Sequence, residues 1–266
     1  MTPLNQLSKC AAQSVNCVFV DIDDTLTTEG RLTAASYSAL EALSEAGIRI
    51  VPVTGRPAGW CDLIARFWPV AGVVGENGAF YFSYDHDARA MRRVYAGSQD
   101  TRRENQEKLA LIRDRVLAEV PGSAVSADQK FRDTDLAIDF CEDVPALGGE
   151  DVERIKEIFE QAGATAKVSS IHVNGWFGSH DKLSMTRRFC LEVLGFELQE
   201  KLDRSIFVGD SPNDSPMFAY FPMSFGVANV RDFEGDLDAS PAWIARERGG
   251  DGFVEIAETL LDARIG

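Results

Sequence analysis

Two runs of apolar, strand-forming residues each end in a loop rich in aspartate, and this pairing constrains the fold more than any other feature. The first run, residues 15–20, leads into Asp21-Ile22-Asp23-Asp24. The second, residues 205–208, leads into residues 209–214, Gly-Asp-Ser-Pro-Asn-Asp. Such runs are typical of buried parallel strands, and in open α/β sheets ligands bind just beyond the carboxyl ends of the strands. We therefore expect the two acidic loops to meet in one crevice.

The segments next to these loops alternate between strand and helix patterns. A helix is expected over about residues 33–46, where Gly47 is a stop signal. Strands are expected over residues 48–53 and 71–74 with a helix between them, and a strand over residues 223–227 precedes a closing helix. Strand, loop, helix and strand in this order indicate a parallel sheet with right-handed crossovers. The expected fold class is α/β, with a Rossmann-like parallel-sheet core.

The middle of the chain has a different pattern, with a higher density of charge. It indicates a helix over about residues 98–119, a strand over 135–141, a helix over 150–162 and two short strands. We interpret this stretch as a smaller α+β domain inserted into the first one. The expected division is residues 1–82 and 180–266 for the core and residues 83–179 for the insert.

Composition and charge limit the compartment and the partners. The net charge of -15 disfavours nucleic acid and anionic membranes as partners, because the field of the chain repels both. The five cysteines are scattered without a CxxC pair, which indicates free thiols in a reducing compartment. No apolar stretch is long enough for a membrane span, and the amino terminus does not resemble a secretion signal. We expect a cytoplasmic protein, either a monomer or a small homo-oligomer.

The expected crevice holds five carboxylates, which would repel one another unless some were protonated or a cation lay among them. Oxygen ligands without a nearby His or Cys favour magnesium over zinc. Magnesium held by carboxylates suits phosphoryl chemistry, because the cation shares the charge of the transferring group. The five residues are Asp21, Asp23, Asp24, Asp210 and Asp214.

Four motifs in this chain resemble those of the haloacid-dehalogenase superfamily, in the family order. Residues 21–27, Asp-Ile-Asp-Asp-Thr-Leu-Thr, resemble the first motif, and Thr54 in Val-Thr-Gly-Arg-Pro resembles the second. Lys182 resembles the third, and residues 209–214 resemble the fourth. The insertion between Thr54 and Lys182 resembles the cap of the Cof-like branch, subfamily IIB. That branch includes sucrose-phosphate, trehalose-phosphate and mannosyl-3-phosphoglycerate phosphatases, so the insert is expected to set substrate specificity.

The resemblance implies a magnesium-dependent phosphatase that hydrolyses a small phosphorylated metabolite, a sugar phosphate, through an aspartyl-phosphate intermediate. Asp21 would be the nucleophile, and Asp23 would act as general acid and then general base. Thr54 would bind the phosphoryl oxygens, and Lys182 would offset the charge between Asp21 and the phosphate. Asp210, the Asp21 carboxylate and the Asp23 backbone carbonyl would hold Mg²⁺. Asp214 would ligate it directly or through water, with Asn213 close by.

Three alternatives remain open from the sequence. The Asp-Lys pair at residues 181–182, preceded by Gly175-Trp176, resembles the phosphomannomutases and leaves a phosphohexomutase as an alternative function. Lys201 is an alternative to Lys182, although it fits the motif order poorly. A non-catalytic module that binds a phosphorylated ligand would be expected to lack one of the first two aspartates, and neither Asp21 nor Asp23 is missing.

Candidate substrate-binding residues come from both parts of the chain. Trp176 and Phe177 are expected to pack in the core or at the hinge, and Asn77-Gly78 could equally be a simple tight turn. His172 is expected to be an ordinary strand residue. The core would supply Gly55, Arg56 and Asn77, and the insert would supply Arg132, Asn174 and His180, with Asp135 and Asp139 as further candidates.

Overall fold

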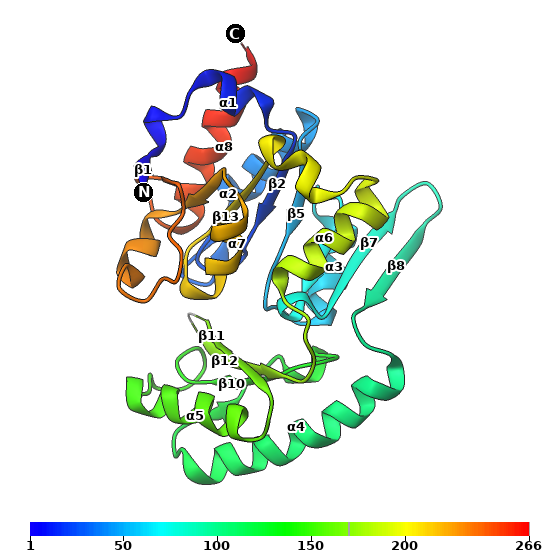
Figure 1. Cartoon of the computed structure of the whole chain (residues 1–266), viewed down its shortest axis with the longest axis vertical. Helices are drawn as coiled ribbons and strands as arrows, with labels where there is room; N and C mark the ends of the chain where they lie inside the picture. Colours follow the sequence, from blue (N-terminus) through cyan, green and yellow to red (C-terminus); the bar gives the residue numbers. More distant parts are fainter. Residues whose placement is uncertain (170, 266) are drawn as a thin grey trace.

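A parallel six-stranded sheet forms the centre of the larger part of the molecule (Figure 1). The computed structural model describes residues 1–169 and 171–265. The strand order is β1-β15-β14-β13-β2-β5, and every neighbouring pair is parallel. The strands are β1 (Thr2–Pro3), β15 (Trp243–Ile244), β14 (Ser224–Gly226), β13 (Ser205–Gly209), β2 (Cys17–Val20) and β5 (Arg49–Pro52).

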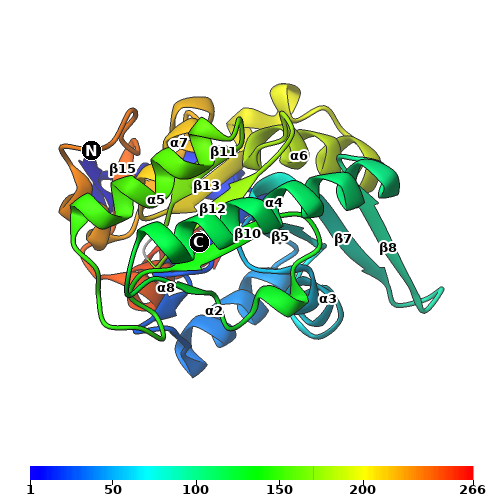
Figure 2. The same ribbon diagram turned by 90° about the horizontal axis from the view of Figure 1, so that it is seen from below.

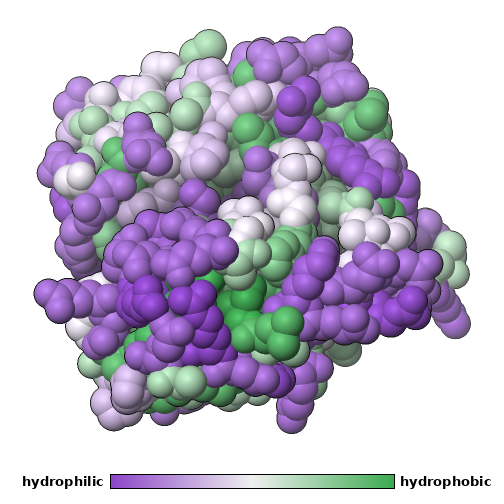
Figure 3. All heavy atoms as spheres, turned by 60° about the horizontal axis from the view of Figure 1, so that its bottom comes forward, coloured by the Kyte–Doolittle hydropathy of each residue, from purple (hydrophilic) through white to green (hydrophobic). Residues whose placement is uncertain are grey.

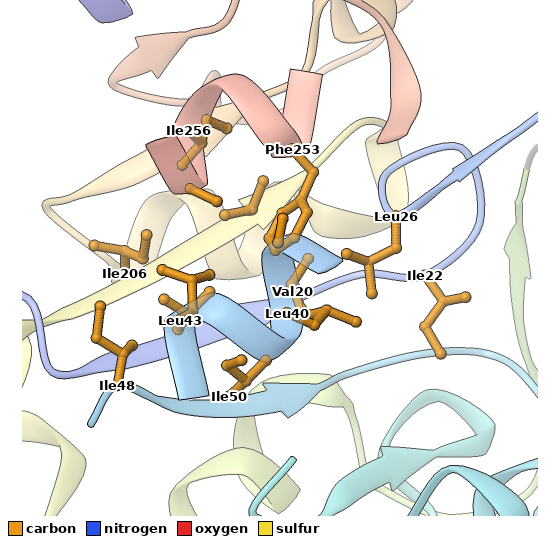
Figure 4. Packing of buried hydrophobic residues seen from close by; sticks show 14 of the residues in the cluster. Val20, Ile22, Leu26, Leu40, Leu43, Ile48, Ile50, Ile206, Phe253 and Ile256 are labelled. Atoms are coloured by element: carbon orange, nitrogen blue, oxygen red, sulfur yellow. The ribbon is translucent and has the colours of Figure 1, made fainter. Parts of the chain in front are cut away.

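Alternate residues of β2 point to opposite faces of this sheet. Val18 and Val20 belong to one apolar cluster, whereas Cys17 and Phe19 belong to another. The first cluster is covered by helices α1 (Lys9–Ser14), α2 (Ala34–Glu45) and α8 (Gly249–Ile265), and Figure 4 shows part of its packing. The second is covered by α6 (Lys182–Phe189) and α7 (Ser215–Tyr220). Because both faces are buried, β2 and β13 are continuous apolar runs, as the sequence predicts.

A three-stranded antiparallel sheet extends this part beyond the expected boundary at residue 82. It consists of β6 (Val73–Gly75), β7 (Phe80–Asp85) and β8 (Ala90–Tyr95). Phe80 and Phe82 pack in the cluster that includes α3 (Ala58–Phe67), whereas Tyr81 packs against Phe189 of α6. The expected boundary therefore falls inside β7, and the hairpin up to Tyr95 packs with the first part of the chain.

The second layer of the molecule is a four-stranded antiparallel sheet with two helices on its outer side. The order is β11-β12-β10-β9, and Figures 1 and 2 show α4 and α5 on the side away from the parallel sheet. A third apolar cluster, which includes Ile138, Ile155 and Phe159, lies between these helices and their sheet. The elements are α4 (Gln99–Glu119), β9 (Ala124–Val125), β10 (Leu136–Asp139), α5 (Gly149–Gln161), β11 (Thr165–Val168) and β12 (His172–Trp176).

Short elements complete the chain. Hydrophilic residues cover most of the face shown in Figure 3, and hydrophobic residues gather in a few places. Among the described residues, no helix combines the length and the apolar character needed to cross a membrane. The remaining strands are β3 (Thr27–Thr28) and β4 (Arg31–Leu32), and a π-helix covers Cys190–Leu194. The 3-10 helices are Leu4–Gln6, Glu76–Gly78, Gln129–Phe131, Leu198–Arg204, Pro212–Asp214 and Ala228–Phe233.

Candidate active site

The two acidic loops meet at the carboxyl edge of the parallel sheet, as the sequence predicts. Asp21 directly follows β2, and Asp210 directly follows the neighbouring strand β13. The backbone N–H of Asp21 donates to the carbonyl of Val208 at 2.9 Å, which continues the ladder between the two strands. The carboxylates are therefore positioned by the register of two buried strands.

Lys182 links the two loops. Its Nζ donates to Asp21 Oδ1 and to Asp214 Oδ1, at 2.8 Å in both cases. Lys182 is the first residue of α6, and Asp181 caps that helix by accepting from the backbone N–H of Ser184. This cap fixes the start of the helix and so places the ammonium group. Lys201, the alternative considered from the sequence, is an exposed residue of the 3-10 helix Leu198–Arg204.

Three buried carboxylates surround this single ammonium group. Asp21, Asp210 and Asp214 each offer an oxygen, and these oxygens all lie within 4.8 Å of one another. Burial raises the pKa of Asp21 to about 7, and the carboxylates of Asp214 and Asp23 add to the rise while Lys182 opposes it. Burial, followed by Asp214 and Asp21, also raises the pKa of Asp210 well above its usual range. The cluster has more negative charge than its own cation can offset, and a divalent cation among these oxygens would remove the imbalance.

Asn229 is a residue of this site that the sequence analysis missed. Its Nδ2 donates to Asp210 Oδ2 at 3.1 Å and to the carbonyl of Asp24 at 2.9 Å. Its Oδ1 accepts from the backbone N–H of Gly249 at 2.9 Å. Asn229 lies three residues after β14 and two residues after the predicted strand at residues 223–227. The argument that site residues follow strand ends could therefore have found it. It orients the Asp210 carboxylate and ties the first acidic loop to it.

The Asp23 side chain points away from the three-carboxylate cluster and toward Arg56. Arg56 Nε lies 2.9 and 3.0 Å from the two oxygens of Asp23, and Nη2 lies 2.7 Å from Oδ1. The same guanidinium donates to Glu142 of the second layer at 3.2 Å and lies over the ring of Trp60 at 4.5 Å. The carboxylate of Asp23, one of the five that the sequence predicts in the crevice, is thus paired with a cation of the chain itself. Its backbone carbonyl is the part that the family resemblance assigns to the metal.

The loop after β5 is held by the loop after β6. Thr54 is fully buried, and its Oγ1 accepts from the backbone N–H of Arg56 at 3.0 Å. The backbone N–H of Asn77 donates to the carbonyl of Thr54 at 3.0 Å, and the Asn77 amide packs against Gly55. Asn77 has φ of 55°, a left-handed conformation that asparagine tolerates better than most residues. Gly55, Arg56 and Asn77 are therefore brought together, and all three line the same pocket.

Arg132 is fully engaged inside the protein. Its side chain is 1% exposed, and it donates to both oxygens of Asp128, to the Asp135 carboxylate and to the carbonyl of Gly55. All three of its guanidinium nitrogens take part in these bonds. Asn174 Nδ2 also donates to Asp135, to Oδ2 at 3.0 Å. The structure thus places Arg132 next to the site as an anchor between the second layer and the Gly55 loop.

Glu76 is the second residue that the sequence analysis missed, and it works beside Arg132. It is fully buried and accepts from the backbone N–H groups of Ala58, Asp133 and Thr134, at 2.9, 2.9 and 2.7 Å. It also accepts from the Thr134 hydroxyl. Burial raises the pKa of Glu76 to about 8, although the hydrogen bonds from Thr134 and Asp133 favour its ionised form. We call Glu76 and Arg132, with the segments that they join, the clasp between the two layers.

His180 is not brought to the site by its side chain. Its ring stacks on Trp176 with centroids 5.7 Å apart, and burial lowers its pKa. It lines a separate cavity of about 420 Å³, which lies between the two segments that join the layers, at residues 96–97 and 177–180. Trp176 is 2% exposed and packs internally, as expected, whereas His172 Nε2 lies 2.9 Å from Glu142 beside the site.

The carboxylate cluster opens into a small polar pocket under the second layer. Its volume is about 20 Å³, which is room for about one water molecule. Ligand pockets are usually on the order of 300–1,000 Å³. Its lining comes from both layers and consists of Asp21, Asp23, Gly55, Arg56, Asn77, Arg132, Ser169, Ile171, His172, Asn174, Ser211 and Asn213.

Comparison with known proteins agrees with this geometry. Residues 18–102 match the family model described as haloacid dehalogenase-like hydrolase, and this stretch contains Asp21, Asp23 and Thr54. Solved structures of that fold match nearly the whole chain, including the part that carries Lys182 and Asp210. The chain is therefore similar to haloacid dehalogenase-like hydrolases in sequence over residues 18–102 and similar in fold to these solved structures over nearly its whole length. The predicted fold class, a Rossmann-like core with a second α+β domain, is confirmed, and the match over residues 18–102 agrees with the predicted family.

The similar structures extend the likeness in fold over both layers. A putative HAD/COF-like hydrolase from Plasmodium vivax is 16% identical, covers 96% of this chain and 99% of its own, and has a TM-score of 0.67. The sucrose-phosphatase of Synechocystis is 13% identical, covers 93% and 98%, and has a TM-score of 0.62. A sugar phosphatase of subclass IIB is 15% identical, covers 92% and 98%, and has a TM-score of 0.59. A search of curated protein sequences gives no match.

Proposed function

We propose that this protein is a magnesium-dependent phosphatase that releases inorganic phosphate from a small phosphorylated metabolite, a sugar phosphate, through a phosphorylated Asp21. One observation carries the proposal: Lys182 Nζ lies 2.8 Å from Asp21 inside a buried cluster of three carboxylates. A nucleophilic carboxylate must be kept ionised in a dry site. An adjacent ammonium group serves that purpose and also offsets the charge of an incoming phosphate.

Asp21 would attack phosphorus, so that a carboxylate–phosphorus bond forms while the bond between phosphorus and the leaving oxygen breaks. Asp23 would give its proton to that leaving oxygen and then accept a proton from the water that attacks the phosphorylated Asp21. The second displacement releases inorganic phosphate and restores the Asp21 carboxylate. Thr54 would hydrogen-bond the phosphoryl oxygens during both steps.

Asp23 needs to be freed from Arg56 before it can serve as a proton donor. In the structure Arg56 donates to both oxygens of Asp23, which holds this carboxylate as an acceptor. We propose that an oxygen of the bound substrate takes over the Arg56 donors and lets Asp23 turn to the leaving oxygen. Arg56 would then contribute both to binding and to the timing of proton transfer.

The residues that would hold magnesium are Asp21, Asp210 and Asp214, with the Asp23 carbonyl, and Asn229 would orient Asp210. The fit rests on the chemistry of the donors, because every carboxylate oxygen in the cluster is a hard ligand and one ammonium group cannot balance three carboxylates. When bound, the cation would supply the positive charge that stabilises the transferring phosphoryl group.

We propose that the second layer, from α4 through β12, is a cap that selects the leaving group. Its residues Asn174, His172 and Ser169 line the polar pocket opposite the core residues Asn77 and Asn213. Amide, hydroxyl and imidazole groups would hydrogen-bond a substrate hydroxyl close to the phosphoryl end, which supports a sugar. The similarity in fold to a sucrose-phosphatase and to a sugar phosphatase also supports a sugar phosphate as the substrate.

The test is a screen of phosphate release over sugar phosphates, sugar-glycerate phosphates and nucleotides, with magnesium and with excess chelator. We expect release from at least one sugar phosphate with magnesium only. Release of inorganic phosphate also separates a phosphatase from a phosphohexomutase, which would retain it. No release from any compound in the presence of magnesium would overturn the proposal.

A further inference from the structure

A second opening borders the catalytic residues, and the proposed mechanism does not use it. It is a groove of about 410 Å³, in the size range of ligand pockets and about twenty times the volume of the polar pocket. Asp23 and Arg56 line both spaces, so the pair separates the groove from the polar pocket. Its other lining residues come from the β3–β4 hairpin, from α3 and from the 3-10 helix at residues 129–131 of the second layer.

The groove is lined mainly by apolar side chains that are unusually exposed. Trp60, Leu63 and Phe131 are 44%, 53% and 45% exposed, and they lie with Ile22, Leu32 and Trp68 around the groove. Contiguous exposed apolar surface next to a reactive centre is typical of a binding site. Trp60 belongs to α3 of the core, whereas Phe131 belongs to the second layer and packs on Gly59 of α3.

The position of Asp23 identifies what the groove would hold. A general acid has to lie within hydrogen-bond distance of the oxygen that leaves. From that oxygen, the rest of the leaving group can extend into the polar pocket or into the groove. The polar pocket admits about one water molecule, and enlarging it by moving the layers apart would break the clasp bonds from Arg132 to Gly55 and from Glu76 to Asp133 and Thr134. The groove has its full volume with those bonds intact.

We infer that the groove, the ring subsite, binds a leaving group that carries a ring with an apolar face, seated against Trp60 and Phe131. This inference rests on the proposed phosphatase function and narrows its substrate class. A pyranose and an aryl ring both have such a face, and both would gain from contact with an exposed indole. Arg56, whose guanidinium lies over the Trp60 ring at 4.5 Å, forms the wall between the ring and the phosphate end.

The test compares three phosphate monoesters: glucose 6-phosphate, 4-nitrophenyl phosphate and glycerol 2-phosphate, which has no ring. In Trp60→Ala and in Phe131→Ala, kcat/KM for at least one ring substrate should fall about tenfold, mainly through KM. The loss on glycerol 2-phosphate should be clearly smaller, and Trp60→Phe should recover most of the lost activity. Phe67→Ala is the matched control, because Phe67 is a 74% exposed aromatic residue of the same helix and does not line the groove.

The two ring substrates distinguish the sources of the ring. A loss confined to glucose 6-phosphate assigns the subsite to a sugar, and a loss confined to 4-nitrophenyl phosphate assigns it to an aryl group. Equal losses on all three monoesters, or no difference from Phe67→Ala, would overturn the subsite. A change of oligomeric state in Trp60→Ala, measured by sedimentation, would overturn it as well, because the groove would then be an interface between copies of the chain.

A binding measurement keeps the two proposals separable. Calorimetry with the Asp21→Asn variant and glucose 6-phosphate or 4-nitrophenyl phosphate needs no turnover. If wild type releases no phosphate but Trp60→Ala in the Asp21→Asn background weakens binding about tenfold, the proposed reaction fails and the subsite stands. If wild type is a phosphatase and Trp60→Ala changes neither binding nor kcat/KM, the subsite fails alone.

Discussion

The catalytic cluster and the clasp are two buried groups of charged residues, and they differ in how their side chains are arranged and hydrogen-bonded. In the catalytic cluster, three carboxylates face one ammonium group, and the pKa of Asp21 rises to about 7. In the clasp, Glu76 accepts four hydrogen bonds and every nitrogen of the Arg132 guanidinium has an acceptor. Buried polar groups ordinarily have hydrogen-bond partners, and those of the clasp do, which indicates a structural role. Burial raises the pKa of Glu76 as well, so the two groups differ in geometry: among the described residues, only in the cluster do three carboxylates bring oxygens within 4.8 Å of one another, an arrangement that suits a bound cation.

The largest loss of activity is expected from the variant Asp21→Asn in the catalytic cluster. The amide cannot form the phosphorylated intermediate, so kcat should fall at least about 10⁴-fold. Stability should not fall. The pKa of Asp21 is higher in the folded protein than in the unfolded chain. Ionisation of Asp21 therefore lowers the free energy of unfolding progressively between about pH 4 and pH 7, and the full loss is present above pH 7. Thermal unfolding at pH 8 should show a melting temperature equal to or above that of wild type, and a marked drop would place Asp21 among structural residues.

Asp23→Asn should have the next largest effect, on the side of the cluster that faces Arg56. Loss of proton transfer should lower kcat by about 10²- to 10⁴-fold. Because a good leaving group needs little protonation, the loss should be smaller for 4-nitrophenyl phosphate than for an alkyl phosphate. Steady-state kinetics with both substrates measure this, and equal losses would count against Asp23 as the general acid.

The clasp should respond in stability. Arg132→Met leaves Asp128 and Asp135 buried without their cation, which should lower the free energy of unfolding by about 3 kcal/mol. The matched control is Arg154→Met, which removes a partly exposed arginine paired with Glu119 and Glu157 in the same layer and should change stability little. Urea unfolding followed by circular dichroism compares the two. Indistinguishable curves would mean that the clasp contributes no more than a surface ion pair.

The smallest expected effect is the stabilisation of the catalytic cluster by magnesium. At about 100 times its dissociation constant, the ion should add about 2.7 kcal/mol to the stability of wild type. Asp210→Asn should lose most of this gain. Glu192→Gln should keep it, because Glu192 pairs with Arg92 and Arg188 outside the cluster. An equal gain in all three proteins would show that magnesium acts elsewhere.

The sequence predicted what depends on strand ends and could not predict what depends on side-chain direction. Two apolar runs followed by aspartates sufficed to place Asp21 and Asp210 together, because neighbouring parallel strands share an edge. The pairing of Asp23 with Arg56 depends on rotamers that no pattern encodes. Glu76 lies beside Asn77 in a loop that reads as a tight turn, and its partners are backbone N–H groups, which leave no trace in the sequence.

The boundary of the first part illustrates a different difficulty. Strand β8 carries two exposed arginines, Arg92 and Arg93, one on each face, so its charge resembles that of the insert. Its pairing with β7 places it with the first part instead, because β7 is almost entirely buried between α3 and α6. Composition alone cannot distinguish an exposed edge strand of one domain from the start of the next.

The most direct test of the account is to trap and locate the phosphoryl group. The Asp23→Asn variant, which should form the phosphorylated intermediate and hydrolyse it slowly, is mixed with magnesium and a good substrate, quenched, and treated with borohydride. Reduction of an aspartyl phosphate gives homoserine, which peptide mass spectrometry can place in the sequence. The account predicts homoserine at position 21 and none in the Asp21→Asn variant. Homoserine at another aspartate, or turnover without any at position 21, would contradict it.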